Sequence, residues 1–277
     1  MKDLYELVLQ TKWLPKSIPY TKHAGSNKLA VIVDPRYDDL MLSVIKNFMF
    51  HMNQRSSVNE AHSSNDGWNF LIVTHASHRA RVNADLPGIS FMPIDAEFLE
   101  DGTKPNMSIA SYNSIMMDSE FWSALPAEHI LIFQTDCYMY KMFNETAYLP
   151  YDYVGANWFN PADTAFFAGG INGGCSLRKR SAMLECLRLV SWDMITAVRE
   201  NQIVKYGIEG RRASVSKRNE DVFYTSACEI LHKKIVAIEK RPKFAVECEF
   251  DEDTCFYHGW NKNYQMEIQA RKMLQLF

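Results

Sequence analysis

The stretch HILIFQTDCYMYKMFNETAYLPYDYVGANW, residues 129–158, decides the fold. Its residues 130–133, Ile-Leu-Ile-Phe, form an apolar run between polar neighbours. Such a run is typical of a strand that is buried on both faces of a parallel sheet. The run ends abruptly at Gln134-Thr135-Asp136. Because open α/β sheets bind ligands at the carboxyl ends of their strands, Asp136 is the first candidate for a binding site.

The residues before this stretch alternate between strand and helix patterns. Apolar runs predict strands at residues 29–33, 68–74 and 89–94. Apolar residues recur at helical spacing over residues 40–52, and residues 112–125 also have a helical pattern. This alternation predicts an α/β fold with a mostly parallel, Rossmann-like central sheet that helices flank on both faces.

The second half of the chain has an α+β pattern. Strands are expected at residues 153–156, 175–178, 235–238 and 244–247, and helices at residues 181–201 and from Glu220 to about Lys233. Between them lie a loop rich in Phe, Gly and Asn at residues 166–174 and a basic, mobile loop at residues 207–217. Short helices are expected near residues 4–8 and after residue 263. Because no linker or repeat interrupts the chain, we expect one domain over residues 1–277, with residues 1–28 as an N-terminal extension.

Composition and charge narrow the class of protein. The chain has 277 residues, a formal charge of -3, 47% hydrophobic and 23% charged residues, which is ordinary globular composition. This charge balance gives no footprint for nucleic acid or for an anionic membrane. No apolar stretch approaches the ~20 residues that span a bilayer. The N-terminus has no secretory signal, and the six cysteines include no CxxC pair, so we expect reduced thiols and a cytoplasmic location.

Two candidate binding elements follow strands. Residues 33–36, Val-Asp-Pro-Arg, end the first strand without a glycine-rich phosphate loop, so a nucleotide would depend on backbone groups and Arg36. Taken alone, a proline turn with a solvated arginine is the favoured interpretation. Asp136 has two equal interpretations, because one carboxylate suffices for a cation that a diphosphate also binds, and an aspartate also caps turns.

Three further candidates lie in the second half. His258, in an aromatic loop, can ligate Mn²⁺ or bind phosphate, although a lone histidine is more often structural. Four glycines within residues 169–174, around Asn172, permit a ligand to approach the backbone closely, or form a plain bulge. Glu220-Asp221 after Asn219 fits a helix N-terminus, and either carboxylate could instead act as a general base, with Asp221 narrowly preferred.

Taken together and in order, these motifs resemble a glycosyltransferase-like family with a GT-A-type fold. The resemblance covers about residues 29 to 260, and each motif by itself is weak. The matching motifs are residues 31–36 (VIVDPR), 133–136 (FQTD), 151–158 (YDYVGANW), 172–178 (NGGCSLR), 220–224 (EDVFY), 244–247 (FAVE) and 256–258 (FYH).

The resemblance implies a transferase of the hexosyl- or pentosyltransferase class. It implies a nucleotide-sugar-binding half at residues 29–158 and an acceptor-binding half at residues 159–277. It implies binding of Mn²⁺ or Mg²⁺ at Asp136 and His258, and a general base at Glu220 or Asp221. The donor would contact the following residues: Val33, Asp34, Arg36, Gln134, Thr135, Asp136, Asn172, Gly173 and Gly174.

The sequence departs from the family pattern at Gln134, where the usual Asp-x-Asp motif has its first aspartate. An amide lacks the carboxylate charge, so the metal would be held more weakly, or the reaction would be independent of metal. We expect an inverting, metal-assisted transfer from a UDP-sugar to a hydroxyl of a glycan acceptor. A retaining transferase on the same fold and a non-catalytic sugar- or nucleotide-binding module are the alternatives. The donor sugar, the acceptor and the linkage stay open.

Overall fold

The computed structural model describes residues 18, 20–53, 67–98, 105–158, 170–206, 219–247, 251 and 253–259. Four expectations lie outside the described residues: the helix near residues 4–8, the loop aromatics Phe159, Phe166 and Phe167, the basic segment 207–217, and the helix after residue 263.

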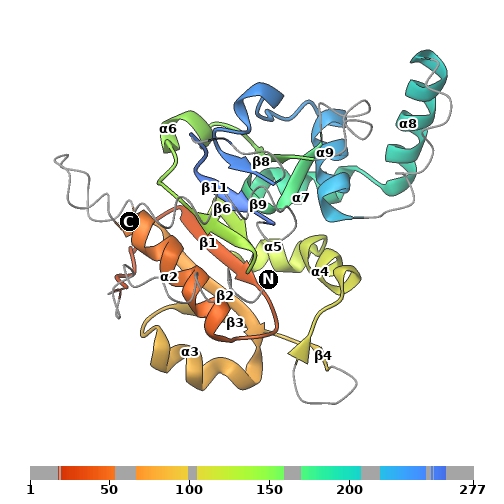
Figure 1. Cartoon of the computed structure of the whole chain (residues 1–277). Helices are drawn as coiled ribbons and strands as arrows, with labels where there is room; N and C mark the ends of the chain where they lie inside the picture. The colour runs from red at the N-terminus through yellow and green to blue at the C-terminus, as the bar shows by residue number, and fades with distance from the viewer. Residues whose placement is uncertain are drawn as a thin grey trace.

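The centre of the fold is a six-stranded sheet with the order β3-β2-β1-β6-β9-β8 (Figure 1). Strands β3, β2, β1 and β6 run parallel, whereas β9 is antiparallel to both β6 and β8. The predicted mostly parallel central sheet is therefore confirmed. The strands are β1 (Lys28–Val33), β2 (Asn69–His75), β3 (Ser90–Ile94), β6 (His129–Phe133), β8 (Tyr153–Asn157) and β9 (Ile171–Lys179).

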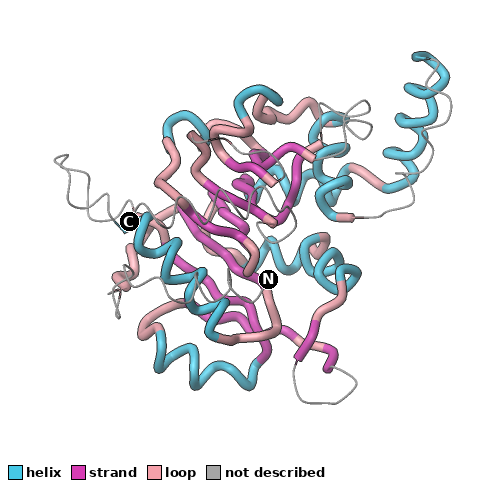
Figure 2. The backbone as a smooth tube through the Cα atoms, viewed as in Figure 1, coloured by secondary structure: helices cyan, strands magenta, loops and turns pink. Residues whose placement is uncertain are grey.

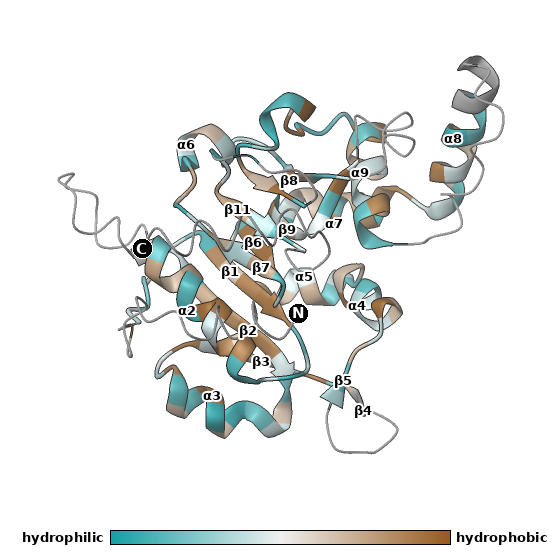
Figure 3. Cartoon of the chain, viewed as in Figure 1, coloured by the Kyte–Doolittle hydropathy of each residue, from teal (hydrophilic) through white to brown (hydrophobic). Residues whose placement is uncertain are grey.

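Helices cover both faces of this sheet (Figures 1 and 2). Along β1, Ala30 and Ile32 pack into one hydrophobic cluster, and Val31 and Val33 pack into the other. The first cluster includes α2 (Asp39–Asn53) and the end of α3 (Arg79–Asp85). The second cluster includes side chains of α4 (Ile109–Met116), α5 (Ser119–Ala124), α7 (Arg180–Leu189) and α9 (Glu220–Ile230). Because both faces are buried, the central parallel strands are apolar over most of their length, as Figure 3 shows for β1 and β2.

The remaining described elements are short, apart from α8 (Trp192–Tyr206). They are η2 (Ala76–His78), β4 (Glu97–Phe98), β5 (Pro105–Asn106), β7 (Cys137–Met139), α6 (Glu145–Tyr148), η5 (Ile238–Lys240), β10 (Ala245–Val246) and β11 (Phe256–His258). Among the described residues, no helix is both long and apolar enough to cross a lipid bilayer.

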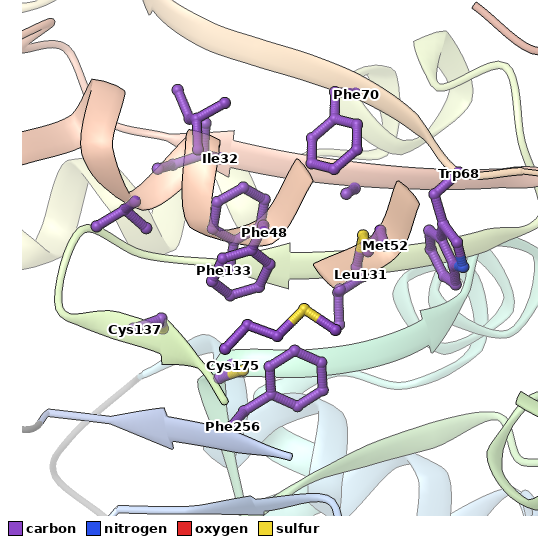
Figure 4. Close-up of a cluster of buried hydrophobic side chains, with 14 of the residues drawn as sticks. Ile32, Phe48, Met52, Trp68, Phe70, Leu131, Phe133, Cys137, Cys175 and Phe256 are labelled. Carbon is purple, nitrogen blue, oxygen red and sulfur yellow. The ribbon is translucent and has the colours of Figure 1, made fainter. Parts of the chain in front are cut away.

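Stacked aromatic rings fasten the C-terminal part of the chain to the central sheet (Figure 4). The ring of Phe48 stacks on Phe133 with 4.0 Å between centroids, and its centroid lies 5.6 Å from that of Phe256. Such pairs add about 0.5–1.5 kcal/mol each beyond the area they bury. Phe256 belongs to β11, which pairs with β7 so that His258 lies opposite Cys137. The packing thus brings His258 beside the residue that follows Asp136.

One predicted strand is wrong. Residues 235–238 form only an isolated bridge, between Ile235 and Tyr153, and the chain then enters the 3-10 helix η5. Val236 is fully buried, but Ile238 is 44% exposed. The apolar run therefore leaves the sheet after Val236, whose N–H donates to Tyr153 O, and pairs with no strand beyond that residue.

Two long predicted helices are each two shorter helices. Residues 112–125 divide between α4 and α5 because Asp118 is extended and its side chain accepts a hydrogen bond from Glu120 N. Residues 181–201 divide between α7 and α8 because Val190 is extended. Apolar periodicity continued across both breaks and concealed them.

The predicted glycine-rich loop is also partly wrong. Residues 171–174 belong to strand β9, which begins at Ile171, so Asn172, Gly173 and Gly174 are strand residues. Glycine is unfavourable inside a strand and marks places where another group approaches the backbone closely. Side chains of other elements lie so close to Gly173 and Gly174 that a Cβ would collide with them.

Candidate functional site

A cleft of about 620 Å³ opens at the carboxyl ends of β1 and β6. It contains all the site residues that the sequence analysis selected, namely Val33, Asp34, Arg36, Gln134, Thr135, Asp136, Asn172, Gly173, Gly174, Glu220, Asp221 and His258. These residues come from both halves of the chain. The carboxyl ends of the parallel strands β1 and β6 meet at this edge of the sheet. Strand β9, helix α9 and strand β11 bring the residues of the second half to it.

Three ligand atoms converge on one wall of the cleft. His258 Nε2 lies 3.2 Å from Gln134 Oε1 and 3.4 Å from Asp136 Oδ1. Asp136 and Gln134 lie in the tight turn after β6, where Cys137 N donates to Gln134 O. Gly259 N donates to Asp136 O at 3.0 Å, which ties the end of β11 to this turn.

The chemistry of these three atoms fits a divalent cation. A carboxylate, an imidazole and an amide oxygen form a mixed nitrogen and oxygen set, which suits Mn²⁺ better than Mg²⁺. The thiol of Cys137 also lies near, since its Sγ and the ligand atoms of Asp136 and His258 are all within 4.8 Å of one another. However, burial raises the pKa of Cys137 well above its usual value, and its Sγ donates to Gly174 O at 3.3 Å. The oxygen and nitrogen atoms of Asp136, His258 and Gln134 could therefore hold such a cation, and the thiol is the least suited of the four groups.

Gly174 packs directly against two of these candidate cation ligands, His258 and Gln134. A Cβ at residue 174 would collide with the imidazole of His258 and would lie 2.7 Å from Gln134 Oε1. At Gly173 a Cβ would collide with the carboxylate of Glu220 and would lie 2.6 Å from Arg178 Nη2. Adjacent glycines on a strand point to opposite faces, so the pair lets two different polar clusters approach β9.

Asp221 presents a carboxylate at the N-terminus of α9. Burial, followed by the negative charge of Glu220, raises the pKa of Asp221 to about 7. Its Oδ2 accepts a hydrogen bond from Trp158 Nε1 at 3.1 Å, and its Oδ1 accepts one from Val222 N at 2.8 Å. Both bonds favour the ionised form and oppose the rise in pKa. The group thus changes charge near neutral pH.

Glu220 has a different environment from its neighbour. Both of its oxygens accept hydrogen bonds from Arg178, with Nη1 to Oε2 at 2.7 Å and Nη2 to Oε1 at 3.0 Å. Arg178 is fully buried, and its guanidinium lies over the rings of Tyr153, Tyr224 and Trp122 at 4.9 to 5.8 Å. This bidentate, buried pair holds the carboxylate of Glu220 in place.

Helix α4 contributes cleft residues that the sequence analysis missed. Asn113 Oδ1 accepts a hydrogen bond from Glu220 N at 3.1 Å, and Asn113 Nδ2 donates to Asn219 Oδ1 at 3.2 Å. The predicted start of the helix after Asn219 is confirmed, but the side chain of Asn219 makes no capping bond. Tyr112 also lines the cleft, and burial raises the pKa of its hydroxyl. Asn113 is separated from Asn219 by 106 positions and from Glu220 by 107. Local sequence spacing therefore gives no sign of these contacts.

At the carboxyl end of β1, Arg36 and Asp34 form an ordered turn. Arg36 Nε and Nη2 donate to the two carboxylate oxygens of Asp34 at 2.9 and 2.7 Å. Asp34 N also donates to Val73 O, so the turn is fastened to β2. The Arg36 side chain is 52% exposed. A rigid turn with backbone groups and a half-exposed guanidinium can receive a polar ligand.

Solved structures with a similar arrangement of the chain include glycosyltransferases. The galactosyltransferase LgtC, in complex with donor and acceptor sugar analogs, has a TM-score of 0.49 and 11% identity over 90% of this chain and 96% of its own. An active-site mutant of LgtC has a TM-score of 0.47 and 10% identity over 83% of this chain and 86% of its own. Apo mouse xyloside xylosyltransferase 1 has a TM-score of 0.49 and 11% identity over 84% of this chain and 97% of its own. At such identities and TM-scores, these likenesses say nothing about activity.

Sequence comparisons give a family. No curated protein matches the sequence. A family model described as "Protein of unknown function (DUF5672)" matches residues 93–261. This range includes Gln134, Asp136, Glu220, Asp221 and His258. Because this match spans more than half of the 277 residues, the chain belongs to the DUF5672 family.

Proposed function

We propose that this chain is a glycosyltransferase that moves a sugar from a nucleoside diphosphate sugar, most simply a UDP-sugar, to a hydroxyl of a glycan acceptor. One observation carries the proposal. A single cleft contains the candidate cation ligands Asp136, His258 and Gln134 together with the carboxylate of Asp221, whose pKa is about 7. A cation site beside a carboxylate that ionises near neutral pH provides both a place for a diphosphate and a base for a hydroxyl.

Each wall of the cleft has its own part in the proposal. The turn at Asp34 and Arg36, with Val33, would hold the nucleoside, as the first half of the chain is expected to do. Asp136 and His258, with the amide oxygen of Gln134, would hold Mn²⁺ or Mg²⁺. When bound, this cation would supply positive charge against the departing diphosphate. The backbone of β9 at Asn172, Gly173 and Gly174 would allow the sugar to lie close, and the second half of the chain would bind the acceptor.

Asp221 would act as the general base of an inverting reaction. Its carboxylate would accept the proton of the acceptor hydroxyl while that oxygen forms a bond to the anomeric carbon. The bond from the anomeric carbon to the diphosphate oxygen breaks, and the electron pair leaves with the diphosphate. A base with a pKa near the working pH is effective because it is ionised and still basic. Glu220, held by Arg178, would help to raise the pKa of Asp221 through its negative charge.

The test is transfer by the full chain from a panel of nucleotide sugars, with and without Mn²⁺. Release of UDP above the rate without protein, abolished in Asp136→Ala and retained in the exposed control Asp193→Ala, is the expected result. The anomeric configuration of the product, read by NMR, separates inversion from retention. If sugars bind equally well with and without UDP and Mn²⁺ and nothing turns over, the chain is a binding module. Gln134, which supplies no charge, is the feature that favours that second function.

A further inference from the structure

The carboxylate of Glu247 lies behind His258, and the proposed transfer gives it no part. Glu247 directly follows β10, which pairs with β11 through Val246 and Tyr257, so its position is next to His258. Its side chain is only 14% exposed, and that of His258 is 3% exposed. Glu247 Oε1 lies 3.8 Å from His258 Nδ1, on the side of the ring away from Asp136. A buried carboxylate therefore faces the nitrogen of His258 that the cation does not use.

We propose that Glu247 is a positioning residue that selects the tautomer of His258. For Nε2 to bind a cation it must carry a lone pair, so in the neutral ring the proton must be on Nδ1. A carboxylate facing Nδ1 stabilises that tautomer, and a shift of about 1 Å closes the 3.8 Å gap to a hydrogen bond. The link to a cation rests on the proposed function, whereas the link between Glu247 and the tautomer rests on the geometry of these two side chains.

The competing tautomer explains why such selection is needed. With its proton on Nε2, His258 would donate to Gln134 Oε1 at 3.2 Å or to Asp136 Oδ1 at 3.4 Å. The ring would then satisfy these oxygens by itself and offer no lone pair to a ligand. These two oxygens favour the Nε2–H tautomer, so a group on the Nδ1 side is needed to oppose them. Among the described residues, Glu247 is the carboxylate that lies there.

The second oxygen of Glu247 connects to β9. Glu247 Oε2 accepts a hydrogen bond from Asn172 Nδ2 at 2.9 Å, and Asn172 Oδ1 accepts one from Gly174 N at 2.8 Å. Gly174 in turn packs against His258 and Gln134. One carboxylate therefore faces the ring of His258 and is also hydrogen-bonded to the strand that covers the ring. This arrangement also assigns a role to the motif at residues 244–247.

The first measurement is the tautomer of His258 in the cation-free protein, read from long-range ¹H–¹⁵N NMR spectra. Signals that disappear in His258→Gln assign the ring. We expect Nδ1–H in the wild type and a shift toward Nε2–H in Glu247→Gln, because the one remaining oxygen satisfies Asn172 and the new amide N–H groups face Nδ1. Nε2–H in the wild type, or the same tautomer in both proteins, would overturn the proposal. The wild-type spectrum decides even if the variant does not fold.

The second measurement is the affinity for Mn²⁺ alone, from the electron paramagnetic resonance signal of the free ion. Loss of such a supporting carboxylate weakens metal binding about 10- to 100-fold. We expect that loss in Glu247→Gln and none in the exposed control Glu239→Gln, with equal melting temperatures. Equal affinities of Glu247→Gln and wild type would overturn the role of Glu247 and leave the proposed function intact. If the wild type binds no Mn²⁺ and transfers no sugar, the proposed function fails, and the tautomer measurement decides the role of Glu247.

Discussion

Trp158 donates its indole N–H to Asp221, with 3.1 Å between Nε1 and Oδ2. The bond stabilises the ionised carboxylate and so holds the pKa of Asp221 lower than burial alone would. The indole comes from the residue after β8, and the carboxylate comes from the start of α9. A residue outside the cleft lining thus adjusts the proposed base.

Removal of this bond should move the pH profile of transfer. In Trp158→Phe we expect the rising limb of kcat/KM, which tracks ionisation of Asp221 near pH 7 in the wild type, to shift upward by about 0.5–1 pH unit. The direction follows because a lost donor disfavours the charged form. The profile is measured from pH 5.5 to 9. Trp192→Phe, on α8, is the matched control, and a limb that stays in place would show that Trp158 does not act on Asp221.

Asp221→Asn should remove transfer and at the same time change how stability depends on pH. The folded pKa of Asp221 is about 7, above the value of about 3.9 in an unfolded chain. The stability contributed by the protonated group is therefore fully present below about pH 4 and is lost as pH rises through 7. Since an asparagine never ionises, the variant should gain about 2 kcal/mol relative to wild type between pH 5.5 and 8.5.

Urea denaturation at the two pH values measures that difference. Asp193→Asn, an exposed site, should show no such change. A constant difference between Asp221→Asn and wild type would mean that the pKa of Asp221 is not raised, and the assignment of Asp221 as the base would lose its support.

The sequence predicted the parts of the site that follow from a single strand or helix. Asp136 was found because an apolar run ends just before it, and Asp221 because a polar turn begins a helix. A parallel sheet places Asp136 beside the end of β1. Asp221 reaches the same cleft on α9, and no local pattern in the sequence shows where that helix packs. The bond from Asn113 to Glu220 could not be predicted in this way, because it joins residues 107 positions apart on different helices. For the same reason the glycines of β9 were expected in a loop: the side chains that exclude a Cβ there belong to distant elements.

The buried ion pair of Arg178 and Glu220 should contribute strongly to the free energy of unfolding. Glu220→Ala leaves a fully buried guanidinium without its carboxylate, and breaking such a pair costs about 3–5 kcal/mol. Glu185→Ala, which removes the half-exposed partner of Lys233, should cost less than about 1 kcal/mol. Urea denaturation of both variants tests the contrast. Equal losses would mean that Arg178 reaches another partner or solvent when Glu220 is removed.

The two glycines of β9 offer a test that separates the cation site from the buried ion pair. In Gly174→Ala the new methyl group would collide with His258, so we expect Mn²⁺ affinity to fall at least about tenfold, as when a supporting group is lost. In Gly173→Ala the collision is with Glu220, in its pair with Arg178, so we expect a lower melting temperature with Mn²⁺ affinity retained in the folded protein. Paramagnetic resonance and calorimetry measure the two effects. Because the substitutions are identical and adjacent, a general disturbance of the strand would affect both readouts in both variants, whereas opposite patterns would place the cation beside Gly174.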